Sequence, residues 1–214
     1  MILYNYFRSS ASYRVRIALN LKGIRYEYRA VHLSRGGGEQ RRPEFLALNP
    51  QALVPVLEHD GVRLTQSLAI LEYLDEIHPS PALLPASAEG RARVRALALT
   101  IACEIHPLNN LRVLHYLTGT AGVTTEAKSD WYRHWVELGL AALESEVARS
   151  RDTGNFCHGD EPGLADCCLI PQLFNARRFD CDLSSYPTLL AIEGRCLELD
   201  AFARAAPERQ PDAE

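Results

Sequence analysis

The pattern of apolar and polar positions divides the chain into two parts of different character. In the first 80 residues, short apolar runs alternate with stretches of helical periodicity. The runs MILYNYF, YEYRAVHL and VPVLEHDGVRLTQ predict strands, and the last is a hairpin with its turn at Asp60-Gly61. SYRVRIALNLKG and SLAILEYLDEIHP predict helices, and QRRPEFLALNP predicts a short helical or irregular segment. The predicted order is βαβαββα.

From about residue 88 the strand signals stop, and the pattern is helical. Long helices are expected in SAEGRARVRALALTIACEIHPLNNLRVLHYLTG, TEAKSDWYRHWVELGLAALESEVARS and GLADCCLIPQLFNARRF, with a kink at His106-Pro107. Two shorter helices are expected near LLAIEGRCLEL and DAFARAA, followed by a frayed tail, PERQPDAE. The proline-rich HPSPALLPAS reads as a linker. We therefore expect one domain over residues 1–80 and an all-helical one over residues 88–214.

Composition narrows the classes of partner. The 214-residue chain has a formal net charge of −4 and a sequence pI of about 6.0, which argues against a nucleic-acid partner. Its six cysteines form no CxxC pair, so we expect neither a structural zinc site nor a disulfide framework, and no metal. The start lacks a signal peptide pattern and no run is long enough for a membrane span, so we expect a cytoplasmic protein.

Serines cluster where the first helix should begin. Ser9, Ser10 and Ser12 lie at a helix N-terminus, where backbone N–H groups and the helix dipole stabilise an anion, including a thiolate. An ordinary serine cap is the alternative. Arginine residues support the anion-site interpretation, because three guanidinium groups lie in the same turn and at least one should meet an anionic ligand. These are Arg8, Arg14 and Arg16, of which Arg16 is expected to face water beside Asn20.

Two further motifs point to ligand binding on the same domain. Proline cannot donate to a sheet ladder, so Val54-Pro55 before a strand favours a cis bond that exposes the Val54 backbone to a peptide-like ligand. A trans proline on an edge strand is the alternative. Gln66 and Ser67 begin the next helix, where Ser67 can cap it and the pair can hold a carboxylate. A plain cap is again the alternative.

These motifs together resemble the zeta class of the glutathione transferases. The resemblance rests on YFRSSASYRVRIAL, NPQALVPVL, QSLAILEYL, GLADCCLIPQ, ARRF and RQPD, and it extends over essentially the whole chain. It implies a thioredoxin-like α/β N-terminal domain (βαβαββα) that binds glutathione and an all-α C-terminal domain that binds substrate. A thioredoxin would carry CxxC where this chain has SSAS, so dithiol redox chemistry is not expected.

The resemblance also implies roles for individual residues. Ser9 would face the glutathione sulfur, assisted by Ser10 and Arg8, and the backbone N–H groups of the same turn would line the thiol site. The implied glutathione-binding residues are Ser9, Ser10, Ala11, Ser12, Tyr13, Arg14, Gln40, Val54, Pro55, Gln66, Ser67, His106 and Asn110. Gln40 would touch the glycyl end, and Gln66 and Ser67 the γ-glutamyl carboxylate. Arg8, Arg112 and Arg178 would bind the substrate.

The activity implied by the resemblance is a glutathione-dependent cis-trans isomerisation. Maleylacetoacetate, a small dicarboxylate of tyrosine and phenylalanine degradation, would become fumarylacetoacetate, with glutathione as a regenerated cofactor. The alternatives are isomerisation of maleylpyruvate to fumarylpyruvate and a general transferase activity of the zeta class. A non-enzymatic binding module on the same fold is a third possibility. The resemblance also implies a homodimer.

Two positions depart from the family pattern. Many zeta enzymes read SSCS, whereas Ala11 stands in place of the cysteine here, so side chemistry that needs that thiol should be absent or changed. The isomerisation should survive, because its nucleophile is the glutathione sulfur. In the helix-starting box, Gly163 replaces the usual Ser or Thr. Asp166 can still accept from a free N–H, so we expect a stability cost of about 1 kcal/mol or less.

Overall fold

The computed structural model describes all of residues 1–214 and groups them into two compact units. One unit comprises Met1–Leu83 with Leu197–Glu214, and the other comprises Leu84–Cys196. This differs from the expected assignment of residues 88–214 to one helical domain. The reason is that helix α9 (Asp200–Ala205) packs on α1 (Ser10–Leu21) of the first unit.

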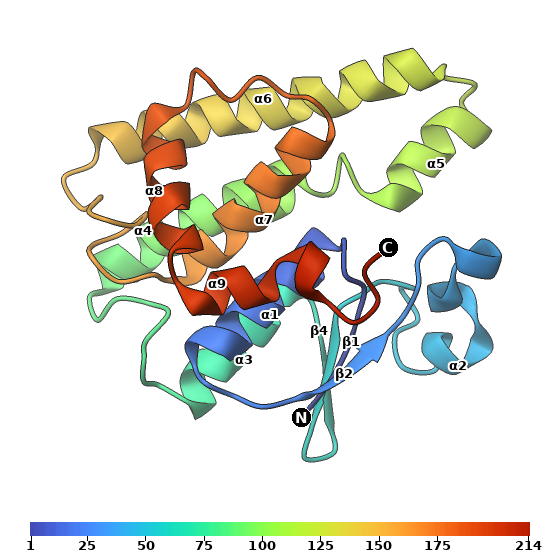
Figure 1. Cartoon of the computed structure of the whole chain (residues 1–214), viewed down its shortest axis with the longest axis horizontal. Coiled ribbons are helices and arrows are strands. Elements are labelled where there is room, and N and C mark those ends of the chain that lie inside the picture. Colours follow the sequence, from blue (N-terminus) through green and yellow to red (C-terminus); the bar gives the residue numbers. More distant parts are fainter. The chain divides into compact units, whose positions relative to one another are not determined.

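A four-stranded sheet forms the centre of the first unit, with strand order β2-β1-β3-β4. Strand β1 runs parallel to β2 and antiparallel to β3, and β3 pairs with β4 in an antiparallel hairpin. The predicted order βαβαββα is confirmed, and Figure 1 shows α1 and α3 on one side of this sheet and α2 on the other. The bounds are β1 Ile2–Asn5, β2 Glu27–Ala30, α2 Pro43–Leu46, β3 Val56–His59, β4 Val62–Thr65 and α3 Ser67–Ile77.

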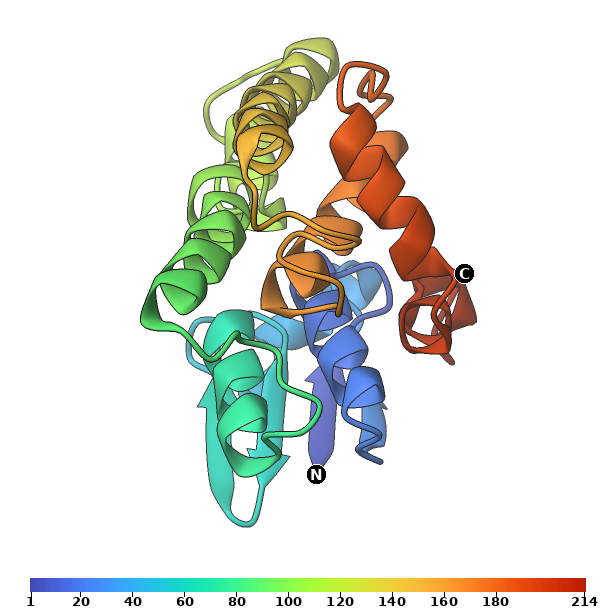
Figure 2. The ribbon, with the colours of Figure 1, turned by 90° about the vertical axis from the view of Figure 1, so that its left-hand side faces the viewer.

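The hairpin turn lies where the sequence places it. Asp60 and Gly61 both have positive φ, 47° and 79°, as a tight two-residue turn between antiparallel strands requires. In Figure 2 the hairpin projects at the lower end of the ribbon, near the N-terminus.

Helix α1 is buried on more than one side, because it packs against both α3 and α9. Val15, Ile17 and Leu19 are each fully buried, although they do not share one face of the helix. This burial overturns the expectation for Arg16, whose exposed fraction is 0%. Its guanidinium donates to the Ala205 carbonyl at 3.0 Å rather than to water.

The tail is ordered rather than frayed, which corrects a further expectation. A 3₁₀ turn spans Pro207–Arg209, and Gln210 donates through Nε2 to the carbonyls of Arg204 and Ala206 at 2.8 Å. Asp212 accepts hydrogen bonds from residues of the sheet and of the turn after β1. The polar composition of the tail suggested solvation, but its side chains find partners far away in the sequence.

Lys22 fixes the chain where α3 leads into the linker. Its ammonium donates to Asp75 Oδ1 at 2.8 Å, to the His78 carbonyl at 2.6 Å and to the Pro81 carbonyl at 2.8 Å. The Lys22 side chain is 0% exposed, so all three donors of the ammonium are used within the protein. Asp75 Oδ1 also accepts from the Leu83 amide at 2.7 Å.

The second unit is helical throughout. Its elements are α4 Ala88–Leu99, a π-helical turn Thr100–Ile105, α5 Leu111–Gly119, α6 Thr125–Arg149, α7 Leu164–Arg178 and α8 Pro187–Leu197, of which Leu197 belongs to the first unit. Helix α7 packs against α4, and the π-helical turn contacts α4, α6 and α7. Trp131 and Trp135, four residues apart on α6, pack edge to face with ring centroids 5.6 Å apart. No helix in the chain is both long and apolar enough to traverse a bilayer.

The expected kink at His106-Pro107 is a complete break in the helix. Residues from His106 to Asn110 are non-helical, and α5 begins afresh at Leu111 with Asn110 as its cap. Just before the break, Ile105 packs over Gly139 of α6. A Cβ atom at residue 139 would lie 2.3 Å from both Cγ1 and Cδ1 of Ile105, so no larger residue fits there without a shift.

Candidate active site

The turn between β1 and α1 presents Ser9 at the start of the helix. Ser9 donates its backbone N–H to the Tyr6 carbonyl at 3.0 Å, which closes the turn. Its hydroxyl oxygen accepts from the Ser12 amide at 3.2 Å, so Ser9 is the N-cap of α1. A hydroxyl that accepts through a lone pair keeps its own hydrogen for donation to an anion. The cap and the anion-site interpretations of Ser9 are therefore compatible.

The first turn of α1 has the polarity of an anion site. It contains no acidic residue that would oppose a negative charge. Ser10 and Ala11 are nearly buried, and Ser12 is fully buried. The Ser12 hydroxyl oxygen has no hydrogen-bond partner in the protein. The helix dipole at this end therefore acts on a weakly hydrated turn, where its electrostatic effect is strongest.

Of the three arginines in this stretch, Arg8 is exposed and the other two are buried. Arg8 donates to the Tyr6 hydroxyl from Nη2 at 2.9 Å and Nε at 3.3 Å, and its guanidinium lies 5.0 Å from the centroid of the Phe7 ring. Arg14 donates from Nη1 to Ser67 Oγ at 3.2 Å. Arg16 binds backbone carbonyls, and burial lowers the pKa of its guanidinium from the ordinary value. Arg8 is thus the arginine of this turn that faces outward.

The Val54-Pro55 peptide bond is cis, as the sequence predicts. Val54 is 9% exposed and belongs to an apolar cluster with Tyr6 and Phe7. This packing ties the proline loop to the turn that carries Ser9. Tyr13, also on α1, is buried.

At the start of α3 the structure corrects one prediction. Ser67 is the first helical residue and not the cap, and its hydroxyl accepts from Arg14. Gln66 occupies the cap position without a capping side-chain bond, and its backbone has φ 68° and ψ 113°. A non-glycine residue with this backbone costs about 1–3 kcal/mol, and such strain concentrates at ligand-binding sites. Gln66 Nε2 donates to Gln51 Oε1 at 3.1 Å, so Gln51 is a polar neighbour that the sequence did not single out.

The Gln40 side chain packs closely against Gly38. It is 6% exposed, and a Cβ atom at Gly38 would lie 2.6 Å from both Nε2 and Oε1 of its side chain. Nε2 donates to the Leu33 carbonyl at 3.3 Å, whereas Oε1 is buried without a partner. An unsatisfied buried acceptor is costly, and a ligand N–H would satisfy it.

The second unit carries the other four expected residues. Asn110 caps α5 by accepting from the Arg112 amide at 3.1 Å, and the Arg112 side chain is exposed. Arg178 ends α7, and its Nη1 donates to Asn175 Oδ1 at 3.4 Å. Its neighbour Arg177 is engaged in a two-pronged ion pair with the nearly buried Glu193, at 2.5 and 2.6 Å. Of the two adjacent arginines, Arg178 is therefore the better ligand candidate. His106 is the partly buried residue that ends the π-helical turn.

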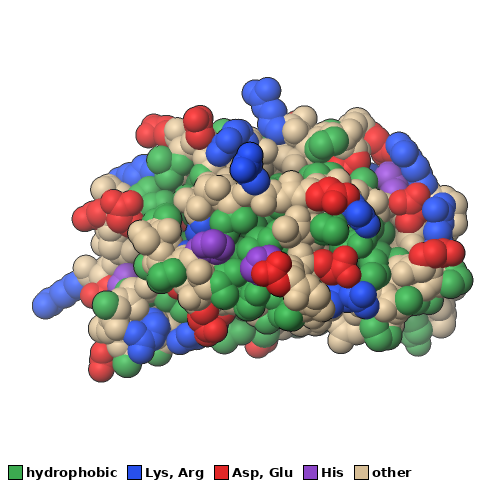
Figure 3. Space-filling model, turned by 90° about the horizontal axis from the view of Figure 1, so that it is seen from below, with side chains coloured by type: hydrophobic (Ala, Val, Ile, Leu, Met, Phe, Trp, Pro, Cys, Tyr) green, Lys and Arg blue, Asp and Glu red, His purple; other side chains and the backbone are tan.

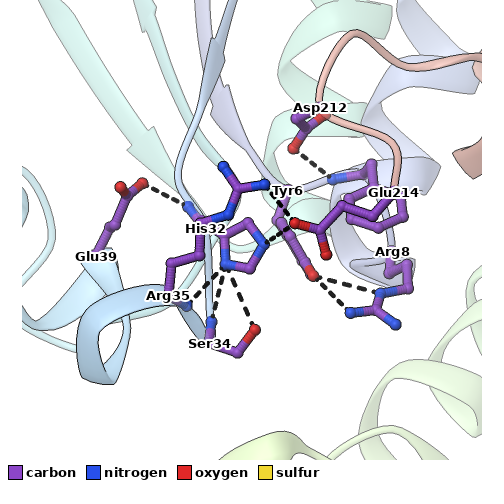
Figure 4. Close-up of polar contacts among 9 residues, drawn as sticks. Tyr6, Arg8, His32, Ser34, Arg35, Glu39, Asp212 and Glu214 are labelled. Atoms are coloured by element: carbon purple, nitrogen blue, oxygen red, sulfur yellow. Dashed lines mark hydrogen bonds and ion pairs between the residues drawn. The ribbon is translucent and has the colours of Figure 1, made fainter.

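Four residues beside the turn were missed by the sequence reasoning. They are Tyr28, His32, Asp212 and Glu214, and Figure 4 shows the last three with Tyr6 and Arg8. The RQPD motif contains Asp212, but nothing in its local pattern signals a partner more than 200 residues away. On the face shown in Figure 3, basic and acidic side chains are interspersed.

Comparison with known proteins places this site in a family. Residues 1–76 match the glutathione S-transferase, N-terminal domain family. A probable maleylacetoacetate isomerase of Vibrio cholerae is 56% identical over 213 residues, covering 100% of this chain and 98% of that protein. The holo structure of a bacterial maleylpyruvate isomerase of the zeta class is 51% identical, with a TM-score of 0.97 and full coverage of both chains. The chain belongs to the zeta class of the glutathione transferases.

One similar structure was solved with a ligand that bears on the chemistry. It is a maleylacetoacetate isomerase from Anaeromyxobacter dehalogenans, 47% identical with a TM-score of 0.85, covering 100% of this chain and 93% of that one. Its active site holds dicarboxyethyl glutathione and citrate. The zeta-class resemblance and the thioredoxin-like plus helical architecture are thus confirmed.

Proposed function

We propose that this chain is a glutathione-dependent cis-trans isomerase that converts maleylacetoacetate to fumarylacetoacetate. The observation that carries the proposal is the dicarboxyethyl glutathione in the relative from Anaeromyxobacter dehalogenans. This compound is a thioether between the glutathione sulfur and a carbon chain with two carboxylates. It has the bond pattern of the adduct that forms when glutathione adds to a cis-unsaturated dicarboxylate.

The reaction proceeds by reversible addition. The glutathione thiolate forms a C–S bond to one alkene carbon, and the alkene electron pair moves through the conjugated ketone to its oxygen as an enolate. The former double bond is now single and rotates. The enolate then re-forms the double bond in the trans arrangement and expels the thiolate, so that no proton or electron is consumed. Glutathione therefore acts as a cofactor.

Ser9 and the N-terminus of α1 supply the thiolate. The Ser9 hydroxyl donates to the sulfur, and the helix dipole favours its negative charge. Glutathione is held by the polar groups of the first unit: Gln66 and Ser67 at its γ-glutamyl carboxylate, the Val54 backbone at its cysteinyl part and Gln40 at its glycyl end. The strained backbone of Gln66 and the unsatisfied Oε1 of Gln40 support these two assignments.

Arginine holds the substrate. The substrate carries two carboxylates, and a guanidinium offers a fork of donors that matches a carboxylate. Arg8, Arg112 and Arg178 are the proposed ligands, and each is exposed. One of them stabilises the enolate oxygen, where negative charge develops. His106 and Asn110 are further proposed glutathione ligands.

Maleylpyruvate is the second candidate substrate. It undergoes the same chemistry with a shorter chain, and the holo maleylpyruvate isomerase with a TM-score of 0.97 favours it. A general transferase acting on apolar electrophiles fits less well with a site that bears three arginines.

A paired assay tests the function. The purified chain is given maleylacetoacetate and maleylpyruvate in turn, with and without glutathione, and the trans products are quantified. We expect turnover of at least one substrate, dependent on glutathione and without net consumption of it. Turnover in the absence of glutathione, or stoichiometric loss of glutathione thiol, would contradict the mechanism.

Assembly and location complete the proposal. We propose a cytoplasmic homodimer, on the strength of the zeta-class membership. Sedimentation velocity at micromolar concentration should give about twice the mass of the 23.9 kDa chain. Recovery of the native protein in the membrane fraction would contradict the proposed location.

A further inference from the structure

The backbone of Phe7, the residue that precedes Arg8, is held at both its N–H and its carbonyl. The Phe7 N–H donates to Asp212 Oδ2 at 3.2 Å, and the Phe7 carbonyl accepts from Arg16 Nη2 at 2.8 Å. Arg16 Nη1 also donates to Asn5 Oδ1 at 3.0 Å and to the Tyr6 carbonyl at 3.3 Å. The turn from Asn5 to Phe7 therefore has little freedom, and the two residues that follow it are Arg8 and Ser9.

Asp212 is itself firmly held. Its Oδ1 accepts from the Tyr28 hydroxyl, so the two carboxylate oxygens are divided between β2 and the turn. Burial and the hydrogen bond to Asp212 raise the pKa of Tyr28 well above its usual range, so this hydroxyl keeps its proton and donates at neutral pH. The negative charge of Asp212 also favours the charged form of the buried Arg16.

A second attachment lies two residues further along the tail. Glu214 Oε1 lies 3.1 Å from His32 Nε2 and also pairs with Arg35 (Figure 4). His32 Nδ1 accepts from the backbone N–H groups of Ser34 at 3.2 Å and Arg35 at 2.9 Å. Because Nδ1 is an acceptor, the ring proton lies on Nε2 and is donated to Glu214.

His32 is linked to Arg8 through Tyr6. The His32 ring packs edge to face on Tyr6, with centroids 4.9 Å apart. The Tyr6 hydroxyl in turn accepts both hydrogen bonds from the Arg8 guanidinium. Asp212 therefore fixes the backbone before Arg8. Glu214, through His32, supports the Tyr6 phenol that orients the Arg8 side chain.

We propose that Asp212, with Glu214 in support, is a positioning residue that acts on the dicarboxylate through Arg8. The proposal rests on the proposed function, because Arg8 is assigned there to substrate binding. Asp212 touches neither substrate nor glutathione in this scheme. Its effect is to hold the turn so that the Arg8 fork meets the carboxylate, an alignment that is sensitive to small displacements.

A double-mutant cycle tests whether Asp212 acts through Arg8. Asp212→Ala is introduced into the wild-type chain and into Arg8→Lys, which keeps a cation but lacks the fork. We expect a loss of roughly tenfold in kcat/KM for the dicarboxylate in the wild-type background. In the Arg8→Lys background the loss should be less than twofold. Equal losses in both backgrounds would overturn the proposal.

Two binding measurements separate positioning from general damage. Calorimetry should give a glutathione Kd within twofold of wild type for Asp212→Ala, and weaker binding of malonate by the glutathione-loaded protein. Parallel weakening of both would overturn the proposal. Glu208→Gln, an exposed change in the same tail, is the matched control and should leave all values unchanged.

A conservative replacement at Asp212 and the behaviour of the wild-type chain make each outcome interpretable. If Asp212→Ala does not fold, Asp212→Asn takes its place in the cycle, since it preserves shape and one acceptor. Glu214→Gln should give a smaller loss in the same direction. A wild-type chain that isomerises neither dicarboxylate contradicts the proposed function. A wild-type chain that isomerises them but shows no coupling between residues 8 and 212 contradicts this inference alone.

Discussion

Both carboxylate oxygens of Asp166 accept backbone hydrogen bonds. Oδ2 accepts from the Gly163 amide at 2.8 Å and Oδ1 from the Cys157 amide at 2.9 Å. The expectation that Asp166 reaches back to a free N–H at the start of α7 is therefore confirmed, although Gly163 lacks a hydroxyl. Burial raises the pKa of this carboxyl from its ordinary value, against the effect of these hydrogen bonds.

The raised pKa of Asp166 determines in which direction the free energy of unfolding changes with pH. The folded-state pKa lies above the unfolded value, so the stability contribution is complete below about pH 3.8 and decreases as the pH rises through the folded pKa. Asp166→Asn removes this slope and loses one acceptor, so it should destabilise by about 1–3 kcal/mol. The difference from wild type should shrink as the pH rises, as measured by urea unfolding between pH 4 and 8.

Asp182 provides the matched control. Hydrogen bonds from Ser184 lower the pKa of this exposed carboxyl, so Asp182→Asn should show the opposite pH trend, with a small effect. An Asp166→Asn deficit that grows with pH would contradict the assignment.

Replacement of Arg112 tests the proposed substrate contacts of the second unit. Arg112→Ala removes one charged hydrogen-bonding group, which should lower kcat/KM for the dicarboxylate roughly ten- to a hundredfold. The glutathione Kd should change little, because this residue is assigned to substrate alone. Arg133→Ala, whose partner is the nearby Asp130, is the control in the same unit. Loss of glutathione binding in Arg112→Ala would refute the role.

At the scale of elements, Gly139 determines how α6 meets the π-helical turn. Alanine favours a helix over glycine by about 1 kcal/mol, but here its Cβ would strike the buried Ile105. Such overpacking costs about 1–3 kcal/mol, so Gly139→Ala should lower the thermal midpoint. At Gly194 in α8 a Cβ meets nothing within 4 Å, so Gly194→Ala should be neutral or stabilising. Equal shifts for the two variants in calorimetry would rule out the steric explanation.

Local pattern predicted most of the elements but not their interruptions. The signals for the strands, the hairpin turn and the cis bond are all local: the hydrophobic period, Asp60-Gly61 and Pro55. The structure confirms these three predictions. One helix was expected across residues 87–119, yet it breaks after the π-helical turn. The sequence signalled a kink through Pro107, but the extent of the break depends on packing between helices.

Side-chain destinations were predictable only where the partner is close in sequence. Ser9 caps the helix that it begins, which is the alternative that its local pattern offered beside an anion site. Arg16 was expected in water because its partners are invisible locally: it donates to Ala205, 189 residues away. Ser67 was expected as a cap, but Arg14 of another helix binds its hydroxyl. The motifs thus suggested which residues to propose for the candidate site, whereas nothing local signalled the contacts of the tail.

At the scale of the whole molecule, the first unit is discontinuous in sequence. Residues 197–214 supply α9 against α1, the Ala205 carbonyl for Arg16 and the Asp212 carboxylate for Phe7. Without them a fully buried guanidinium would lose a partner, which is a costly change. The thioredoxin-like part is therefore not an independent folding unit over residues 1–83.

A fragment experiment checks this prediction. Residues 1–83 alone should show no cooperative unfolding by far-UV circular dichroism, whereas the full chain should. Addition of a peptide spanning residues 197–214 should restore part of the signal, and a scrambled peptide should not. Cooperative unfolding of the isolated fragment, with native-like stability, would disprove the prediction.

The arrangement around Lys22 has a practical consequence for chemical labelling. The chain has 21 arginines but two lysines, Lys22 and Lys128. The Lys22 amine is enclosed by oxygen atoms and has no exposed side-chain surface, so acylating dyes cannot reach it in the native fold. Apart from the α-amino group, such reagents meet a single lysine, on α6. Apart from that terminal amine, fluorophores or surface supports can therefore be attached at one defined lysine without engineering the polypeptide.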